Sequence, residues 1–348
     1  MSKQIYVQAQ ADHIESLFKG SPLMALEELV WNALDADAKE VKVDLITNPL
    51  GAVDAVRISD DGTGIDALNA DRTFGNLGGS WKREGKGTEN AGRRLHGRHG
   101  RGRFKAFALG LNVEWRTTTR VGDGLLSYKL SGEADKPGVF TLEDAPAGVA
   151  TGTEVYVSNV RATVDSLLDA GETVQNLAAK FALYLKSYPD VRIYFNGLPV
   201  TPVIVQKQTT DYLLKLENGT EAKLEVIEWK RKFVGAGHLV FAGPDGFQLH
   251  EQAAGVRTGS GVPFTAYLIS PRIPALAAEN ALVMDELNPE VRMYLDEVKK
   301  TLKAHFLALG ESKSEFEVEW EEKVQSFTKA ECKSLLAILK RAIKAQKD

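Results

Sequence analysis

The sequence predicts an α/β fold in two parts, because helical and strand patterns alternate along most of the 348 residues. In the first 160 residues, an amphipathic helical segment precedes several strand segments, and glycine clusters separate them. A second region from about residue 165 to 309 again mixes helices with strands. Hydrophobic residues make up 43% of the chain and charged residues 26%, so both parts have enough apolar residues to form a core.

The first predicted helix covers residues 21–38. Ser21 is a residue type preferred at helix N-caps, and Pro22 suits the first helical position. Two strands are predicted next, at 41–46 and 55–59, because their residues alternate between apolar and polar types.

A long stretch at 69–102 follows, rich in glycine and charge and with little periodicity. Loops of this length are uncommon in compact domains and often act as lids over functional sites. The apolar segment 104–111 is expected to be helical. Four antiparallel strands should come next, at 113–119, 125–130, 138–142 and 152–157.

The second region opens with a helix expected at 174–188, which ends before Pro189. A long helix is expected at 290–309. Between these helices the pattern predicts five strands, at 191–195, 202–206, 223–229, 238–242 and 265–270.

The C-terminal segment is acidic at 311–322, and its later apolar residues, beginning at Cys332, recur at helical spacing. Ordinary packing explains such a stripe, and a partner or dimer helix is the alternative. The expected division of the chain is therefore a first domain at 1–160, a second at 161–310, and a charged helical segment at 311–348.

The composition excludes several classes of protein. A net charge of −4 creates no overall field toward nucleic acid or an anionic membrane, so any such binding needs a local patch. The single cysteine excludes an internal disulfide and a cysteine-rich metal site, and it fits a reducing cytosol. The N-terminus lacks an apolar signal core, and no apolar run approaches the roughly 20 residues that span a bilayer. We therefore expect a soluble, cytoplasmic protein with no membrane partner.

Glu28, Asn32 and Asp35 lie on one face of the first predicted helix. Offsets of four and seven residues place them on a narrow stripe, opposite the apolar residues. A solvated face of an amphipathic helix has the same pattern. However, an amide oxygen is a suitable ligand for magnesium, and a carboxylate one turn away can orient and deprotonate a water molecule. The stripe is therefore a candidate magnesium-phosphate site.

Asp60-Asp61-Gly62-Thr63-Gly64 follows directly after a predicted strand. A turn at a strand end has the same composition, because Asp and Gly favour turns. The functional interpretation is that the Asp60 carboxylate accepts a hydrogen bond from the exocyclic amino group of adenine. Gly62 and Gly64 would let the backbone come close to the base.

A third cluster, Gly97-x-x-Gly100-x-Gly102, precedes the apolar segment 104–111. Glycine-rich turns that open a helix offer backbone N–H groups to anions. The run from Arg93 to Lys105 is basic and contains no acid. A triphosphate site, a solvated flexible loop and a nucleic-acid contact are the alternatives for it. The run is not a Walker loop, because the G-K-[ST] sequence is absent.

These clusters, in this order, resemble the motifs of the GHKL ATPases, the class of gyrase B, the heat-shock chaperones, sensor histidine kinases and the MutL mismatch-repair proteins. Residues 28–36, ELVWNALDA, resemble the first motif, E-x-x-x-N-x-x-D-A. The Asp60 and Gly97 clusters resemble the second and third motifs, and Gly152-Thr153 resembles the fourth. Asn76-Leu77-Gly78 and Ser80-x-Lys82 are similar to lid segments of the chaperone and MutL branches. The resemblance covers roughly residues 10–160.

The resemblance implies a fold as well as a site. It implies a two-layer sandwich with a mixed, mostly antiparallel sheet and helices on one face. A transducer-like α+β domain would follow at 161–310, although that part carries no motif and rests on analogy of fold.

Carried over residue by residue, the resemblance implies that Glu28 is the general base and that Asn32 binds Mg²⁺. Asp60 would recognise adenine, supported by Gly62, Gly64 and Thr153, and Asp35 would line the pocket beside the base. The remaining nucleotide-binding residues would belong to the lid and the third motif: Asn76, Lys82, Gly97, Gly100 and Gly102.

Relatives in this class often supply a basic residue from the transducer to the γ-phosphate. Arg272, in Ser270-Pro271-Arg272, is the candidate for this catalytic role, and Lys207 is a weaker one. The sequence departs from the gyrase pattern here, because no Q-T-K loop occurs at the expected place.

The implied activity is Mg²⁺-dependent binding of ATP and its hydrolysis to ADP and phosphate. Lid closure and homodimerisation of a molecular clamp or machine would accompany ATP binding. One alternative is a nucleotide-gated scaffold or binding module with negligible hydrolysis. A histidine kinase is less favoured, because no phosphoacceptor helix precedes the nucleotide domain. The client could be DNA, a protein or a partner ATPase.

Overall fold

The computed structural model describes residues 11–66, 74, 88, 90–93, 95–96, 102–232, 237–256, 261–284 and 288–325, with side chains described from 13 to 309. The chain divides into two compact units: Met1–Gln206 with Gly243–Phe247, and Lys207–Ala242 with Gln248–Asp348. No helix in the described part of the chain combines the length and the apolar character needed to span a bilayer.

The first unit is built on an eight-stranded sheet with strand order β5-β4-β3-β6-β2-β1-β7-β8. Only the β1–β7 pair is parallel among its neighbouring strands, which confirms a mixed, mostly antiparallel sheet. The strands are β1 (Glu40–Thr47), β2 (Val53–Asp60), β3 (Gly110–Val121), β4 (Gly124–Glu133), β5 (Phe140–Asp144), β6 (Gly152–Val160), β7 (Arg192–Phe195) and β8 (Leu198–Pro199).

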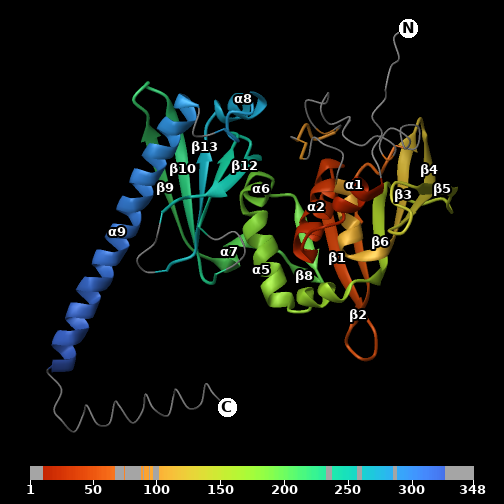
Figure 1. The fold of residues 1–348 in the computed structure, drawn as a ribbon, viewed down its shortest axis with the longest axis horizontal. Helices are drawn as coiled ribbons and strands as arrows, with labels where there is room; N and C mark the ends of the chain where they lie inside the picture. Colours follow the sequence, from red (N-terminus) through yellow and green to blue (C-terminus); the bar gives the residue numbers. More distant parts are fainter. Residues whose placement is uncertain are drawn as a thin grey trace. The chain divides into compact units, whose positions relative to one another are not determined.

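Helix α2 (Pro22–Asp35) packs against β1 and β2, as Figure 1 shows. Its N-cap is as expected, because Ser21 Oγ accepts a hydrogen bond from Met24 N at 3.2 Å. The apolar side of α2 is buried, while Glu28 and Asn32 remain half-buried. The other helical segments of this unit are α1 (Ala11–Ser16), α4 (Gly102–Lys105), η3 (Ala106–Ala108), η4 (Ala162–Leu167), α5 (Ala170–Lys180), α6 (Ala182–Ser187) and α7 (Pro202–Val205).

The unit boundary differs from the one expected at residue 160, because the first unit continues to Gln206. Strand β7 pairs in parallel with β1, with Glu40 opposite Arg192. Leu177 of α5 and Phe181 also belong to the hydrophobic core of the first unit. A chain ending near 160 would leave these contacts unmade, so residues 161–206 are part of the first unit.

Three other sequence-based expectations for local structure were wrong. The segment 104–111 is helical only to Ala108, and β3 begins at Gly110. The helix expected at 174–188 is two helices, separated at Phe181. Residues 202–205 form α7 rather than a strand, because Pro202 occupies the first position of a helical turn.

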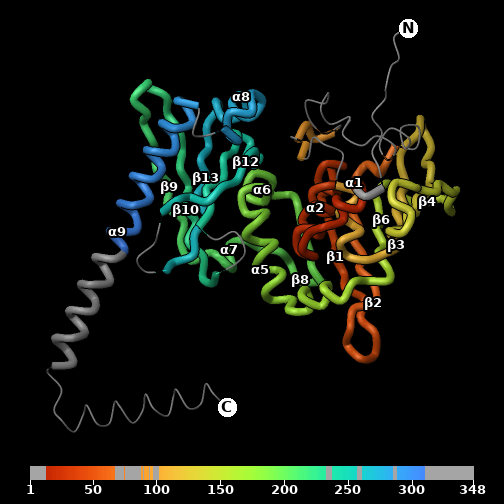
Figure 2. The backbone as a smooth tube through the Cα atoms, in the orientation of Figure 1, coloured from red at the N-terminus to blue at the C-terminus, as the bar shows by residue number. Residues whose placement is uncertain are grey.

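The second unit contains a five-stranded sheet in the order β12-β11-β13-β10-β9. The long helix α9 (Pro289–Gln325) runs alongside β9 and β10 (Figure 2). Val291, Tyr294, Val298 and Leu302 recur at helical spacing and are fully buried in the core of this unit. The other elements are β9 (Gln206–Lys215), β10 (Glu221–Trp229), β11 (His238–Ala242), β12 (Gln248–Ala253), β13 (Phe264–Ile269) and α8 (Ile273–Ala278).

Candidate nucleotide site

Three polar residues form a row across the ends of neighbouring strands in the first unit. Asp60 of β2 is opposite Thr153 of β6, and Thr153 is opposite Thr117 of β3. Residues directly opposite one another in an antiparallel sheet point to the same face. Val157 and Val113, which lie further along β6 and β3 with the same parity, are fully buried in the core. The three polar side chains therefore point to the same face of the sheet as the apolar core, and they lie next to its apolar residues along the strands.

Asp60 is held by backbone groups from two of the predicted motifs. Its Oδ1 accepts hydrogen bonds from Gly62 N at 2.9 Å and from Thr153 N at 3.3 Å. Burial raises the pKa of its carboxyl group to about 7, and the two backbone hydrogen bonds oppose that rise. In the described part of the chain, both of these bonds use Oδ1, so Oδ2 is the oxygen offered to a ligand.

The two glycines of the Asp60 turn are required by close backbone contacts. A methyl group at Gly62 would lie 2.5 Å from the carbonyl oxygen of Ala36, the C-cap residue of α2. Gly64 has a φ of +77°, and a methyl group there would overlap the carbonyl oxygen of Thr118. Thr63 N also donates to Ala36 O at 2.7 Å. These contacts place the end of α2 directly against the turn that follows Asp60.

Glu28, Asn32 and Gly102 lie together, which joins the first and third motifs. A methyl group at Gly102 would contact Glu28 Oε1 and lie 3.1 and 3.3 Å from Asn32 Nδ2 and Oδ1. Because residue 102 has no side chain, its backbone can lie directly against the Glu28 carboxylate and the Asn32 amide. These residues fit magnesium, because that ion is usually held by one or two protein oxygens with phosphates and water as its other ligands.

We expect Gly102→Ala to fold normally but to lower ATP turnover by about 10- to 100-fold, because its methyl group displaces the Glu28 carboxylate. Phosphate release and thermal unfolding would be measured on the same samples. Gly20→Ala is the matched control, since its methyl group would lie no closer than 3.7 Å to any neighbour, Lys105 Nζ. Equal turnover in the two variants would show that ATP hydrolysis does not depend on the close approach of Gly102 to Glu28 and Asn32.

Asp35 is buried and contacts His96, which lies inside the stretch 69–102 expected to form the lid. Its Oδ1 accepts a hydrogen bond from His96 N at 2.7 Å. The His96 ring stacks on Trp31 with centroids 4.3 Å apart and planes 9° apart. In the same region, Asp37 Oδ2 accepts hydrogen bonds from Asn90 N at 2.6 Å and Ala91 N at 3.3 Å. Asp35 thus anchors the chain near residue 96, and its expected place beside the base stays a prediction.

The described members of the basic run are used inside the first unit. Arg93 is buried, and its guanidinium donates to Ala38 O at 2.8 Å and to Tyr184 Oη at 3.3 Å. Arg103 donates to Phe74 O, and burial lowers its pKa to about 10. Lys105 Nζ donates to Lys19 O at 2.7 Å. The sequence allows a triphosphate site, a solvated flexible loop or a nucleic-acid contact for this run. For these three residues the contacts are structural instead.

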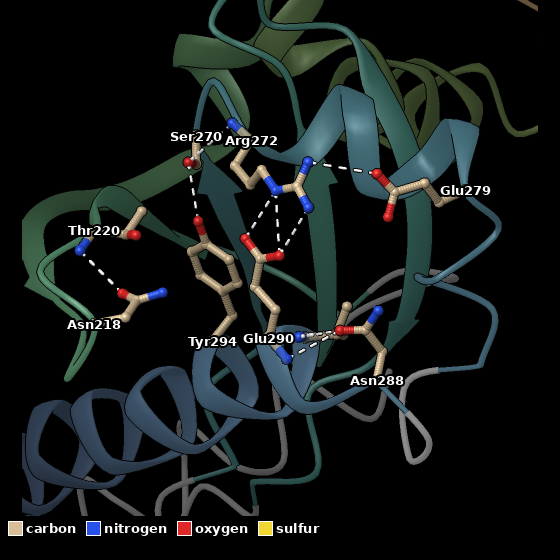
Figure 3. A network of polar contacts seen from close by, with 9 residues as sticks. Asn218, Thr220, Ser270, Arg272, Glu279, Asn288, Glu290 and Tyr294 are labelled. Carbon is tan, nitrogen blue, oxygen red and sulfur yellow. Dashed lines mark hydrogen bonds and ion pairs between the residues drawn. The ribbon is translucent and has the colours of Figure 1, made fainter.

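Four of the predicted site residues, Asn76, Lys82, Gly97 and Gly100, lie outside the described residues. Arg272 lies in the second unit at the start of α8, where Glu290 binds its guanidinium through two oxygens (Figure 3). A second carboxylate, Glu279, lies 3.4 Å from Arg272 Nη1. We interpret Arg272 as joining α8 to the start of α9, and its contact with the γ-phosphate stays a prediction. Lys207 pairs with the buried Glu228 at 3.3 Å.

Sequence analysis missed two residues that support the candidate site. Thr117 Oγ1 accepts a hydrogen bond from Ile65 N at 2.9 Å, and Tyr128 Oη donates to Ile65 O at 2.6 Å. Both side chains therefore fix the residue that follows Gly64. A threonine or tyrosine inside a strand gives no signal of such a role, so only the pairing of strands could identify them.

The second unit has a surface cavity of about 520 Å³ between β9 and α9. Its lining includes Tyr212 and His305, joined by a 2.7 Å hydrogen bond between Tyr212 Oη and His305 Nδ1. The buried Glu228 lies 3.3 Å from His305 Nε2. None of the site residues predicted from the sequence lines this cavity.

Comparison with known proteins finds a family whose model matches part of the first unit. Residues 21–134 match the family described as histidine kinase-, DNA gyrase B- and HSP90-like ATPases. The matched region is about a third of the chain and contains Glu28, Asn32, Asp60 and Gly102. A search of curated proteins gives no significant match.

Proposed function

We propose, from the premise that residues 21–134 form a GHKL-type ATPase domain, that this chain binds ATP with magnesium and hydrolyses it to ADP and phosphate. The observation that carries the proposal is the proximity of Gly102 to both Glu28 and Asn32. This proximity places a carboxylate and an amide oxygen beside Gly102, where α4 begins. The turn that follows Asp60 lies against the C-terminal end of α2, and Oδ2 of Asp60 is the oxygen proposed to contact the base.

Each residue has a distinct task in the proposed mechanism. Asp60 accepts a hydrogen bond from the adenine amino group and so orients the nucleotide. Asn32 would hold Mg²⁺, and the bound ion would neutralise part of the negative charge on the phosphates. Glu28 orients a water molecule and takes its proton as the oxygen attacks the terminal phosphorus. As that bond forms, the bond between the terminal phosphorus and its bridging oxygen breaks, and ADP leaves with the bridging oxygen. The inorganic phosphate keeps the oxygen of the water molecule, and the proton ends on the Glu28 carboxylate.

The proposal is tested by titrating the purified chain with ATP and with GTP in the presence of magnesium, followed by a phosphate-release assay. ATP is expected to bind about 10- to 100-fold more tightly than GTP, because guanine presents a carbonyl where adenine presents an amino group. Equal affinities would contradict the assignment of Asp60. ATP binding without phosphate release would instead favour the alternative, a nucleotide-gated scaffold acting on DNA or a protein client.

ATP, and not ADP, is expected to drive homodimerisation. The stretch 69–102 is rich in glycine and charge, and ordering each residue of such a segment costs about 1–2 kcal/mol. Contacts with the γ-phosphate would offset that cost only in the ATP state, and the ordered lid would offer a new surface. Light scattering of Glu28→Ala with ATP and magnesium, compared with ADP, measures this. A monomer under both conditions at saturating nucleotide would contradict the switch.

A further inference from the structure

Thr117 contacts three polar groups at the end of the row that begins at Asp60. Its hydroxyl oxygen accepts a hydrogen bond from Ile65 N at 2.9 Å. The same hydroxyl donates to Gly152 O at 3.1 Å and lies 3.1 Å from Thr153 Oγ1. Thr117 is only 3% exposed, so these contacts are not exchanged freely for water.

The number of protons at Thr117 decides the direction of the contact with Thr153. A hydroxyl group has one proton and two lone pairs. Ile65 N–H uses one lone pair, and the Gly152 carbonyl takes the proton because a carbonyl cannot donate. The second lone pair is left for Thr153, whose hydroxyl must therefore be the donor. The Thr153 proton is then used inside the protein, and its oxygen has only lone pairs to offer a ligand.

Asp60 has the same character. Its Oδ1 accepts from Gly62 N and Thr153 N, and above its pKa of about 7 the ionised carboxylate has no proton to donate. The affinities are therefore compared at pH 8. Two neighbouring positions in the row therefore offer acceptors. Such a pair favours an amino group and disfavours a carbonyl, because two acceptors that face each other leave both without a partner.

We propose that Thr117 determines the base specificity of the nucleotide site by fixing Thr153 as a hydrogen-bond acceptor, so that the site favours an amino group over a carbonyl at position 6 of a purine. The inference rests on the proposed function, ATP binding at Asp60. Thr117 acts through Thr153 and is a positioning residue. It also shares the support of Ile65 with Tyr128.

Loss of the Thr117 hydroxyl has two separable effects. Loosening of the turn at Ile65 weakens every nucleotide alike, because it does not depend on the base. Release of Thr153 changes only the ratio between bases, since its hydroxyl becomes free to turn and donate to a carbonyl. The ratio of affinities for ATP and ITP, which carries a carbonyl at position 6, therefore reports the proposed role.

Thr117→Val has nearly the same shape as the wild type and lacks the hydroxyl, while Thr117→Ser keeps it. Calorimetric titration of the full chain would give dissociation constants for ATP and ITP in all three proteins. The wild type and Thr117→Ser are expected to prefer ATP by about 10-fold or more. In Thr117→Val, that preference should fall at least about fivefold, because Thr153 can then donate to the ITP carbonyl.

A second measurement uses the wild type alone and does not depend on the folding of a variant. Purine riboside triphosphate has hydrogen at position 6, so it is neutral toward Thr153. The triphosphate of 6-methoxypurine riboside has an oxygen acceptor at position 6 and, like purine riboside, no proton on N1. It should bind more weakly than purine riboside triphosphate if Thr153 is an acceptor, and equal or tighter binding would overturn the inference. An unchanged ATP-to-ITP ratio in Thr117→Val would overturn it too. Those results leave ATP binding standing, whereas a wild type that binds no ATP refutes the proposed function itself.

Discussion

Glu28→Ala is expected to lower ATP turnover by at least about 100-fold while ATP still binds, because a general base contributes about that much to proton transfer. The residue is half-buried on α2 and lies beside Gly102 and Asn32, where it can contact a water molecule near the terminal phosphate. Phosphate release measures turnover, and calorimetry measures binding. Glu28→Gln, which keeps the shape of the side chain, should lose turnover to a similar extent.

The adjacent carboxylate gives a matched control for Glu28. Glu27 is also half-buried on α2, but the helical rotation of about 100° per residue turns it away from Asn32. Glu27→Ala should therefore retain most of the turnover. Unchanged phosphate release from Glu28→Ala would place the base elsewhere in the chain.

Asp60→Asn is expected to weaken ATP by about 10- to 100-fold. If the asparagine oxygen keeps the hydrogen bonds from Gly62 N and Thr153 N, its amide nitrogen takes the place of Oδ2. That nitrogen carries protons, so it opposes the amino group of adenine. Asp61→Asn is the control, because Asp61 Oδ1 accepts from Lys39 N and Glu40 N, and an asparagine oxygen can replace it there.

The same carboxyl group should make stability depend on pH. The folded pKa of Asp60, about 7, lies above the ordinary value of 3.8, so between these pH values the folded state binds more protons than the unfolded state. The free energy of unfolding without nucleotide therefore falls as pH rises from about 4 to about 7, by at most about 4 kcal/mol. Urea denaturation at pH 5 and pH 8 measures it. Asp60→Asn should lack this contribution, and an identical pH dependence in both proteins would contradict the raised pKa.

The local parts of the site were predictable from the sequence because each depends on a residue type at a fixed spacing. Ser21 and Pro22 predicted the start of α2 correctly. The helical spacing of Glu28, Asn32 and Asp35 predicted which face of α2 carries the candidate site residues. Asp60 was identified because an acidic glycine turn followed an alternating strand. These features depend on short-range sterics and hydrogen bonding, so they need no knowledge of distant strands.

The long-range parts were not predictable, because they depend on which strands become neighbours. Thr117 and Ile65 are 52 residues apart in sequence, and nothing near either residue indicates the other. The apolar, β-branched run at 203–205 favoured a strand, but Pro202 begins a helical turn there instead. The link between β1 and β7 was missed for the same reason, and with it the true end of the first unit.

That β1–β7 pairing also sets a condition on the order of folding during synthesis. Asn196 Oδ1 accepts a hydrogen bond from Leu45 N, 151 positions earlier in the chain. The ribosome must therefore release nearly the whole first unit before β1 has its second neighbour. Until then, β1 presents an unpaired edge, and the growing chain is exposed to aggregation at that strand. By contrast, β2, which ends at Asp60, has both of its neighbours, β1 and β6, as soon as residue 160 has been made.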